Sequence, residues 1–254
     1  MAGKLAPAVP AASLILVRDG KAGLEVLMTE RAKTMRFAPG AFVFPGGKVD
    51  STDQQNWRWQ AITTGRGVFR DFALRVAALR ELYEEAGILQ IDHRRRAVLV
   101  PGLPFSDLVR YCGGKLDIAG MVPFAHWVTP EPMPRRFDTH FYIAAHNGET
   151  AKHDGYEAVS LKWVCPRQLL QDWEEDRIPL MFPTRLNLTK LARASTVADA
   201  LRQAKRSRVV RTLPVVNMSG AGIKLQIDKA AGYGVTSASE KELAVEAGGI
   251  AKKP

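Results

Sequence analysis

The segment from Arg80 to Ile88, which reads R-E-L-Y-E-E-A-G-I, constrains the fold of this chain most strongly. Its glutamates Glu81, Glu84 and Glu85 are spaced so that they share one face of an α-helix. Apolar residues at helical spacing predict a buried stripe on the same helix: Phe72, Val76, Leu79 and Leu82. Gly87 is placed to end the helix. The sequence therefore predicts a core helix with three carboxylates on one side.

Three carboxylates on one helix face repel one another, and a cation held between them relieves the repulsion. Because carboxylate oxygens are hard ligands, the expected ion is Mg²⁺ or Mn²⁺, bound by Glu81, Glu84 and Glu85. The alternative is a solvated surface helix in which Glu84 pairs with Arg80 one turn earlier.

A glycine pair, Gly46 and Gly47, follows an apolar run that begins at Ala41. This pattern predicts a strand that ends in a turn. Glycine lets the backbone approach a ligand closely, so the carbonyl of Gly46 is a further candidate metal ligand. The alternative is that both glycines only shape the turn.

Together these segments resemble the Nudix hydrolase family, whose box runs G-x5-E-x7-R-E-U-x-E-E-x-G-U, with U an apolar residue. The second half of the box is filled at every fixed position, by Arg80, Glu81, Glu84, Glu85 and Gly87. The first half of the box departs from the family pattern. An insertion at about residues 51–70 lengthens this half, and its glutamate is missing. Asp53 and Asp71 are the candidate substitutes.

The resemblance implies an α/β fold, a Nudix-type α/β/α sandwich with a mixed β-sheet, over residues 1–204. Residues 205–254 are expected to form a C-terminal extension with a docked hairpin and a mobile tail. Strands are expected at Ser13–Val17, Glu25–Thr29, Ala41–Phe44, Ala97–Val100, Gly120–Val128, Phe137–Ala144 and Ala158–Val164. A short helix near Ser106–Tyr111 and another from Pro166 to about Trp173 complete the prediction.

The stretch from Leu27 to Gly47 is similar to the signature of coenzyme A diphosphatases within this family. The matching residues are Arg31, Ala32, Arg36, Gly40 and Phe44. Guanidinium groups just ahead of the glycine pair suit phosphate oxygens, so Arg31 and Arg36 are the substrate-binding candidates. The alternative is that both are ordinary surface cations.

The resemblance implies hydrolysis of a diphosphate linkage in a small nucleoside diphosphate derivative. Coenzyme A or acyl-coenzyme A would give 3′,5′-ADP and (acyl-)4′-phosphopantetheine. Arg80 is expected to orient the glutamates, and Glu81 and Glu157 compete for the role of general base. Two alternatives stay open: a Nudix hydrolase of ADP-ribose, dinucleotides or capped RNA, and a non-catalytic module that senses nucleotides or binds nucleic acid.

The composition, with 46% hydrophobic and 24% charged residues among 254, fits one globular domain, although the length also allows two. No apolar run approaches the roughly 20 residues of a membrane helix, so we expect a cytoplasmic protein without a membrane partner. Cys112 and Cys165 have neither metal-site nor disulfide spacing. A homodimer is left open.

Much of the net charge of +10 lies between Arg185 and Arg211, where eight lysines and arginines face Asp199 alone. No aromatic residues are interleaved, so nucleic acid is disfavoured as a partner and a solvated helical face is favoured. His126, His140 and His146 have no recognisable zinc-site spacing, which disfavours zinc chemistry. Trp57 and Trp59 are expected to pack the insertion against its domain, with capping of an adenine or acyl group as the alternative.

Overall fold

The computed structural model describes residues 6–32, 34, 38–65, 69–92, 102–149, 158–219 and 222–247. The strands are β1 (Ala8–Gly20), β2 (Gly23–Arg31), β3 (Phe42–Val43), β4 (Gly46–Lys48), β5 (Val122–Val128), β6 (Arg136–Ala145), β7 (Ala158–Val164), β8 (Arg211–Thr212), β9 (Val215–Ser219) and β10 (Gly222–Gln226). The helices are α1 (Asn56–Trp59), η1 (Gln60–Ile62), α2 (Phe72–Ala86), α3 (Phe105–Cys112), α4 (Pro166–Glu174), α5 (Phe182–Leu191), α6 (Val197–Arg206), η2 (Lys229–Ala231) and α7 (Glu240–Ala247).

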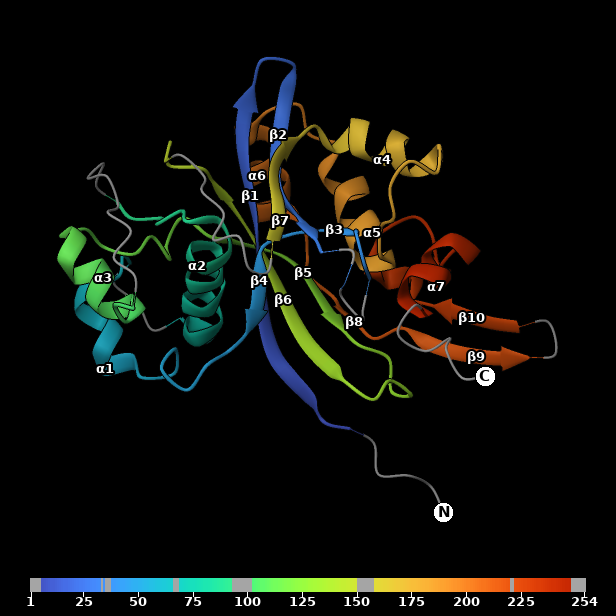
Figure 1. Cartoon of the computed structure of the whole chain (residues 1–254), viewed down its shortest axis with the longest axis horizontal. Helices are drawn as coiled ribbons and strands as arrows, with labels where there is room; N and C mark the ends of the chain where they lie inside the picture. The colour runs from blue at the N-terminus through green and yellow to red at the C-terminus, as the bar shows by residue number, and fades with distance from the viewer. Residues whose placement is uncertain are drawn as a thin grey trace.

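A mixed sheet forms the centre of the molecule (Figure 1). In the described part of the chain its main path runs β3-β2-β1-β6-β5-β8, with β4 paired to β1 and β7 paired to β2. Strand β1 is parallel to β6 and antiparallel to both β2 and β4. Because β1 is 13 residues long, its N-terminal part pairs with β4 and its C-terminal part with β2.

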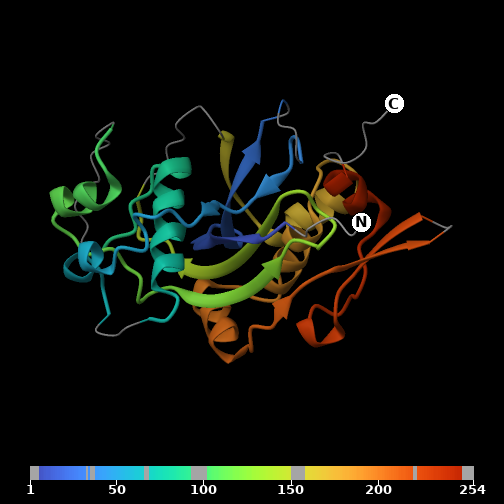
Figure 2. The ribbon, with the colours of Figure 1, turned by 90° about the horizontal axis from the view of Figure 1, so that it is seen from below.

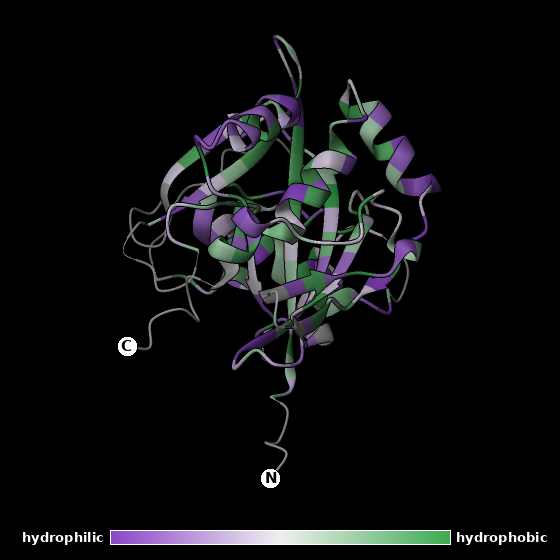
Figure 3. Ribbon diagram, turned by 90° about the vertical axis from the view of Figure 1, so that its right-hand side faces the viewer, coloured by the Kyte–Doolittle hydropathy of each residue, from purple (hydrophilic) through white to green (hydrophobic). Residues whose placement is uncertain are grey.

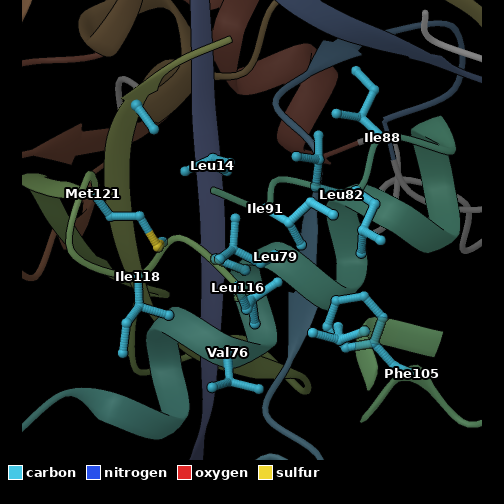
Figure 4. Packing of buried hydrophobic residues seen from close by; sticks show 14 of the residues in the cluster. Leu14, Val76, Leu79, Leu82, Ile88, Ile91, Phe105, Leu116, Ile118 and Met121 are labelled. Atoms are coloured by element: carbon cyan, nitrogen blue, oxygen red, sulfur yellow. The ribbon is translucent and has the colours of Figure 1, made fainter. Parts of the chain in front are cut away.

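Helix α2 covers one face of this sheet, and α4, α5 and α6 cover the other (Figures 1 and 2). The predicted stripe of α2 packs onto the sheet, and Val76, Leu79 and Leu82 are fully buried in one hydrophobic cluster with Leu14 of β1 (Figure 4). Hydrophobic residues predominate along the central strands, whereas the outer helices are hydrophilic over part of their surface (Figure 3). The predicted α/β/α sandwich with a mixed sheet is therefore confirmed.

Helix α2 ends where its sequence predicts. Gly87 takes a left-handed conformation with φ 65°, and its N–H donates to the carbonyl of Tyr83 at 2.8 Å. Glycine adopts this conformation without steric cost, so it stops the helix directly after the last glutamate.

The glycine pair differs from its prediction, because Gly46 and Gly47 belong to the short strand β4 and not to a turn. Gly46 has no room for a side chain, since a Cβ there would lie 2.5 Å from the carbonyl oxygen of Ala12 and 2.6 Å from Cα of Ser13. Glycine at this position lets β4 pair closely with β1. The strand predicted at residues 97–100 lies outside the described residues.

The insertion folds as α1 and η1 and is anchored by Trp59. This side chain is 1% exposed, packs against Phe105 of α3, and donates through Nε1 to the carbonyl of Thr52 at 2.9 Å. The packing role predicted for Trp59 is confirmed. Trp57, by contrast, is 72% exposed and stacks with Arg58.

The C-terminal residues make buried polar contacts with the rest of the chain. Tyr233 donates its hydroxyl to Asn187 of α5 at 2.9 Å and accepts a hydrogen bond from Trp127 of β5 at 3.0 Å. Glu242 of α7 has a completely buried side chain and pairs with Arg185 of α5 at 2.5 Å. Strands β9 and β10 form a hairpin that projects from this side of the molecule (Figure 1).

The basic segment is not simply a solvated helical face. Arg185 lies against Glu242 with 13% of its side chain exposed, and Lys190 donates to the carbonyl of Phe124 at 2.7 Å. Burial lowers the pKa of Lys190 to about 8. The solvated-face prediction is therefore wrong for these two cations. No helix in the described ranges has the length and apolar character needed to cross a membrane.

Candidate active site

Arg80 lies at the centre of a hydrogen-bond network on α2. Its Nη1 donates to Oε1 of Glu81 at 3.0 Å and to Oε2 of Glu84 at 2.7 Å. Its Nη2 donates to the carbonyl of Lys48 in β4 at 2.9 Å. Arg80 thus contacts two of the three predicted glutamates, and the same guanidinium joins α2 to the strand of the glycine pair.

Asp53 is the principal partner of Arg80 and is completely buried. Its carboxylate accepts from Nε and from Nη2 of Arg80, both at 3.0 Å, and from the backbone N–H of Asp50 at 2.8 Å. Burial by itself lowers the pKa of Arg80, but the hydrogen bonds and charge of Asp53 outweigh it, so the pKa is raised overall. Arg80 therefore stays charged although only 11% of its side chain is exposed.

Glu81 leans over Gly47. A Cβ on Gly47 would lie 2.4 Å from Cδ of Glu81, so only glycine leaves space for this carboxylate. The Glu81 side chain is 17% exposed, and burial raises its pKa although the charge of Arg80 opposes the rise.

Glu85 and Glu84, the other two predicted glutamates, have different partners. Glu85 accepts a hydrogen bond through Oε2 from the backbone N–H of Gly46 at 3.3 Å. Glu84 is half exposed, and burial raises its pKa against the lowering effect of Arg80. The structure therefore places Glu81 and Glu85 against the glycine pair and joins Glu84 to Glu81 through Arg80.

Asp71, the other candidate for the missing glutamate, has a different position. It precedes the first turn of α2 and accepts from Nε of Arg75 at 3.0 Å and from the hydroxyl of Tyr142 at 2.8 Å. These contacts tie the start of the helix to β6. Neither aspartate therefore extends the glutamate group directly, since Asp53 is engaged by Arg80.

The sequence from residue 59 to residue 191 matches the family described as the NUDT19 Nudix domain, a little over half of the chain. The chain belongs to the Nudix family. The fold agrees with this assignment, because a Nudix hydrolase from Alicyclobacillus acidocaldarius superposes with a TM-score of 0.70 at 28% identity. That match covers 81% of this chain and 100% of the solved one.

Two curated relatives place the chain more closely within the Nudix family. The acyl-coenzyme A diphosphatase NUDT19 of Xenopus laevis is 25% identical over 233 residues, which cover 69% of this chain and 61% of the relative. The putative nudix hydrolase 7 of Caenorhabditis elegans is 29% identical over 192 residues, 72% of this chain and 60% of the relative. The chain thus spans about three fifths of the length of these relatives.

Of the other predicted site residues, the structure describes Arg31 but not Arg36 or Glu157, which lie outside the described residues. Arg31 ends β2, and its backbone exchanges hydrogen bonds with the loop before the glycine pair. Its N–H donates to the carbonyl of Ala41 at 3.0 Å, and its carbonyl accepts from Gly40 at 3.1 Å. The backbone of Arg31 therefore joins the end of β2 to the loop that leads to the glycine pair.

Sequence reasoning missed the role of Asp53 as the buried partner of Arg80. The available signal was an aspartate six residues after Gly47, the distance at which the Nudix box places its first glutamate. Its pairing with Arg80 joins residues 27 positions apart, which no local pattern reveals.

Proposed function

We propose that this chain is a divalent-metal-dependent hydrolase of the diphosphate linkage of coenzyme A or acyl-coenzyme A. The products would be 3′,5′-ADP and 4′-phosphopantetheine, or its acylated form. The observation that carries the proposal is the set of Nudix glutamates, with Glu85 and Glu81 against Gly46 and Gly47 and Glu84 joined to Glu81 through Arg80.

The charges of the site fit a divalent cation. Asp53, Glu81 and Glu84 all bond to the single guanidinium of Arg80, so the carboxylates outnumber the cation that holds them. Glu81, Glu84 and Glu85, with the carbonyl of Gly46, form an all-oxygen donor set of the kind that Mg²⁺ and Mn²⁺ prefer. Bound there, the ion would neutralise the diphosphate oxygens and the leaving phosphate.

The side chains then have separate tasks. Arg80 holds Glu81 and Glu84 through charge-assisted hydrogen bonds, while Asp53 fixes Arg80 itself. In the reaction, water oxygen bonds to one phosphorus, the bridging P–O bond breaks, and a water proton passes to a carboxylate. Glu81 and Glu157 are the two competing bases for that proton.

Gly47 provides a test of how closely Glu81 must be placed. In a Gly47→Ala variant the added methyl would occupy the position of the Glu81 carboxylate, and we expect kcat to fall about 10²-fold with little loss of stability. Steady-state kinetics and thermal unfolding of the same sample measure the two effects.

Gly46→Ala is the matched variant, because its methyl meets the backbone of β1 and not a site carboxylate. We expect it to lower the free energy of unfolding by about 1–3 kcal/mol, as overpacking does. Equal catalytic and stability losses in both variants would contradict the separate role given to Gly47.

The substrate class is supported by the Arg31 signature and by the names of relatives. Beyond the acyl-coenzyme A diphosphatases of frog and other vertebrates, a peroxisomal coenzyme A diphosphatase of Caenorhabditis elegans is 36% identical over 79 residues. Arginine suits phosphate recognition because its planar guanidinium bonds two oxygens at once. We therefore assign Arg31 and Arg36 to the phosphates of the substrate.

Product analysis tests the proposal directly. The protein is incubated with Mg²⁺ and, in parallel, coenzyme A, an acyl-coenzyme A, ADP-ribose and a dinucleoside polyphosphate. Preferential release of 3′,5′-ADP from the first two supports the proposed substrate. Preference for another compound would keep the Nudix chemistry and reject coenzyme A, while inactivity on all four, with Mn²⁺ also tried, would favour a binding module.

An Arg31→Ala variant extends this test to substrate binding. We expect KM for coenzyme A to rise about tenfold or more with a smaller change in kcat, because a charge-assisted hydrogen bond is worth about 1.5–3 kcal/mol. Arg110→Ala is the control, since Arg110 is 43% exposed and pairs with Asp107 on α3. An unchanged KM in Arg31→Ala would remove Arg31 from the substrate site.

The non-catalytic alternative finds less support, because its contact surface was the basic segment and two of those cations, Arg185 and Lys190, are engaged inside the fold. A cytoplasmic location and a homodimer remain proposals, which cell fractionation and light scattering test.

A further inference from the structure

Three side chains that have no part in the glutamate site meet on strands β5 and β6. The ligand atoms of His126, Asp138 and His140 all lie within 4.8 Å of one another. Nε2 of His126 is 2.5 Å from Oδ1 of Asp138, and Nε2 of His140 is 3.8 Å from the same oxygen. One carboxylate oxygen therefore faces two imidazole nitrogens.

The register of the sheet creates this cluster. His126 and His140 are direct partners in the antiparallel pair of β5 and β6, and their rings stack with centroids 3.9 Å apart. Asp138 is two residues before His140 in β6, so its side chain lies on the same face of the sheet. The spacing of the histidines along the chain matches no zinc motif, so zinc was not expected, but cross-strand pairing brings His126 and His140 together.

We propose that His126, Asp138 and His140 form a second metal site, specific for borderline divalent ions such as Zn²⁺. Two imidazoles and one carboxylate are a known ligand set for Zn²⁺, with a further position left for water or another ligand. Ligands of a tetrahedral Zn²⁺ lie about 3.3 Å apart, so small side-chain rotations bring these atoms to binding distance.

The surroundings of the cluster agree with a metal site. The side chains of His126, His140 and Asp138 are 15%, 33% and 31% exposed, so an ion can reach them from solvent. Arg211 of β8 lies 3.9 Å from Oδ2 of Asp138, which leaves Oδ1 turned toward the imidazoles.

This cluster is separate from the glutamates, although it lies on the same face of the sheet. Gly47 pairs with Ala12 of β1, and Ala12 pairs with His140 of β6, so two strand spacings separate the sites. At ~4.8 Å per spacing, the backbone of His140 is roughly 10 Å from that of Gly47. The ligand chemistry also differs, because Mg²⁺ prefers oxygen whereas imidazole selects ions of the Zn²⁺ class.

An ion held here would clamp β5 to β6 in their register. A ligand that binds only the folded state raises the free energy of unfolding with the logarithm of the ratio of its concentration to Kd, and Tm rises accordingly. At a hundredfold excess over Kd, we expect Zn²⁺ to raise Tm by roughly 5–10 °C in excess Mg²⁺. This readout is independent of hydrolysis.

The test uses tag-free protein in excess Mg²⁺, which occupies the glutamate site. Zn²⁺ is titrated calorimetrically, and Co²⁺ and Cu²⁺ serve as spectroscopic probes. We expect one bound Zn²⁺, absorption typical of tetrahedral Co²⁺, and coupling of Cu²⁺ to two imidazole nitrogens. His126→Gln and His140→Gln should each weaken Zn²⁺ binding about a hundredfold, and Asp138→Asn about tenfold.

His146→Gln is the matched control, because His146 contacts the carbonyl of Glu149 at 2.7 Å and has no part in the cluster. It should leave Zn²⁺ affinity unchanged, and metal-free thermal unfolding of each variant verifies the fold. Unchanged Zn²⁺ binding in the His126→Gln/His140→Gln double variant, or no binding by the native protein, would overturn the proposal. The cluster would then be a stacked histidine pair in which His126 is hydrogen-bonded to Asp138, without a metal.

Discussion

A Glu84→Gln variant is expected to lose about 10²- to 10³-fold in kcat/KM at saturating Mg²⁺. The change keeps the shape of the side chain but removes the charge that a divalent ion requires, and a bound ion contributes several kcal/mol of transition-state stabilisation. Glu84 is half exposed, so its replacement leaves the hydrophobic core intact. Initial rates over a Mg²⁺ titration separate weakened metal binding from loss of kcat.

The control for this measurement is Glu174→Gln, which makes the same chemical change at an exposed position of α4. It should retain full activity. If Glu84→Gln also retained full activity with either Mg²⁺ or Mn²⁺, the glutamates would not form the metal site, and the proposed hydrolase mechanism would fail.

The second large effect is expected from Asp53→Asn, which should lower the free energy of unfolding by about 3–5 kcal/mol. Asp53 is completely buried, and its replacement leaves Arg80, only 11% exposed, without its main counter-charge. The side-chain NH₂ group of asparagine would also face the N–H donors of Arg80, and two donors form no hydrogen bond with each other. Chemical denaturation measures the loss, and Tm should fall by roughly 10 °C.

Catalysis should suffer in the same variant, because Arg80 positions Glu81 and Glu84. Asp107→Asn is the comparison, since the pair between Asp107 and Arg110 is 46% and 43% exposed. Exposed pairs contribute about 0–1 kcal/mol, so that variant should remain close to the native protein. Equal stability of the two variants would contradict the structural role given to Asp53.

Much of the helical site was predictable because its signals are local. The stripe of Val76, Leu79 and Leu82 and the stop at Gly87 depend only on the repeat of a helix and on glycine at a left-handed position. Strand β7 and helix α4 were also predicted almost to the residue, because alternation and an N-terminal proline are local patterns. Strand β4 was not, since three residues are too few to show alternation.

Local patterns were enough to predict helix α2, the spacing of its glutamates and the presence of the glycine pair, because each depends on neighbours within a few residues. The pairing of Asp53 with Arg80 and the contact of Glu81 with Gly47 depend on the folded chain. The fold also brought His126 and His140 together through strand register. All three contacts join residues that are far apart in the sequence. They depend on the packing of distant segments, which local sequence patterns do not reveal.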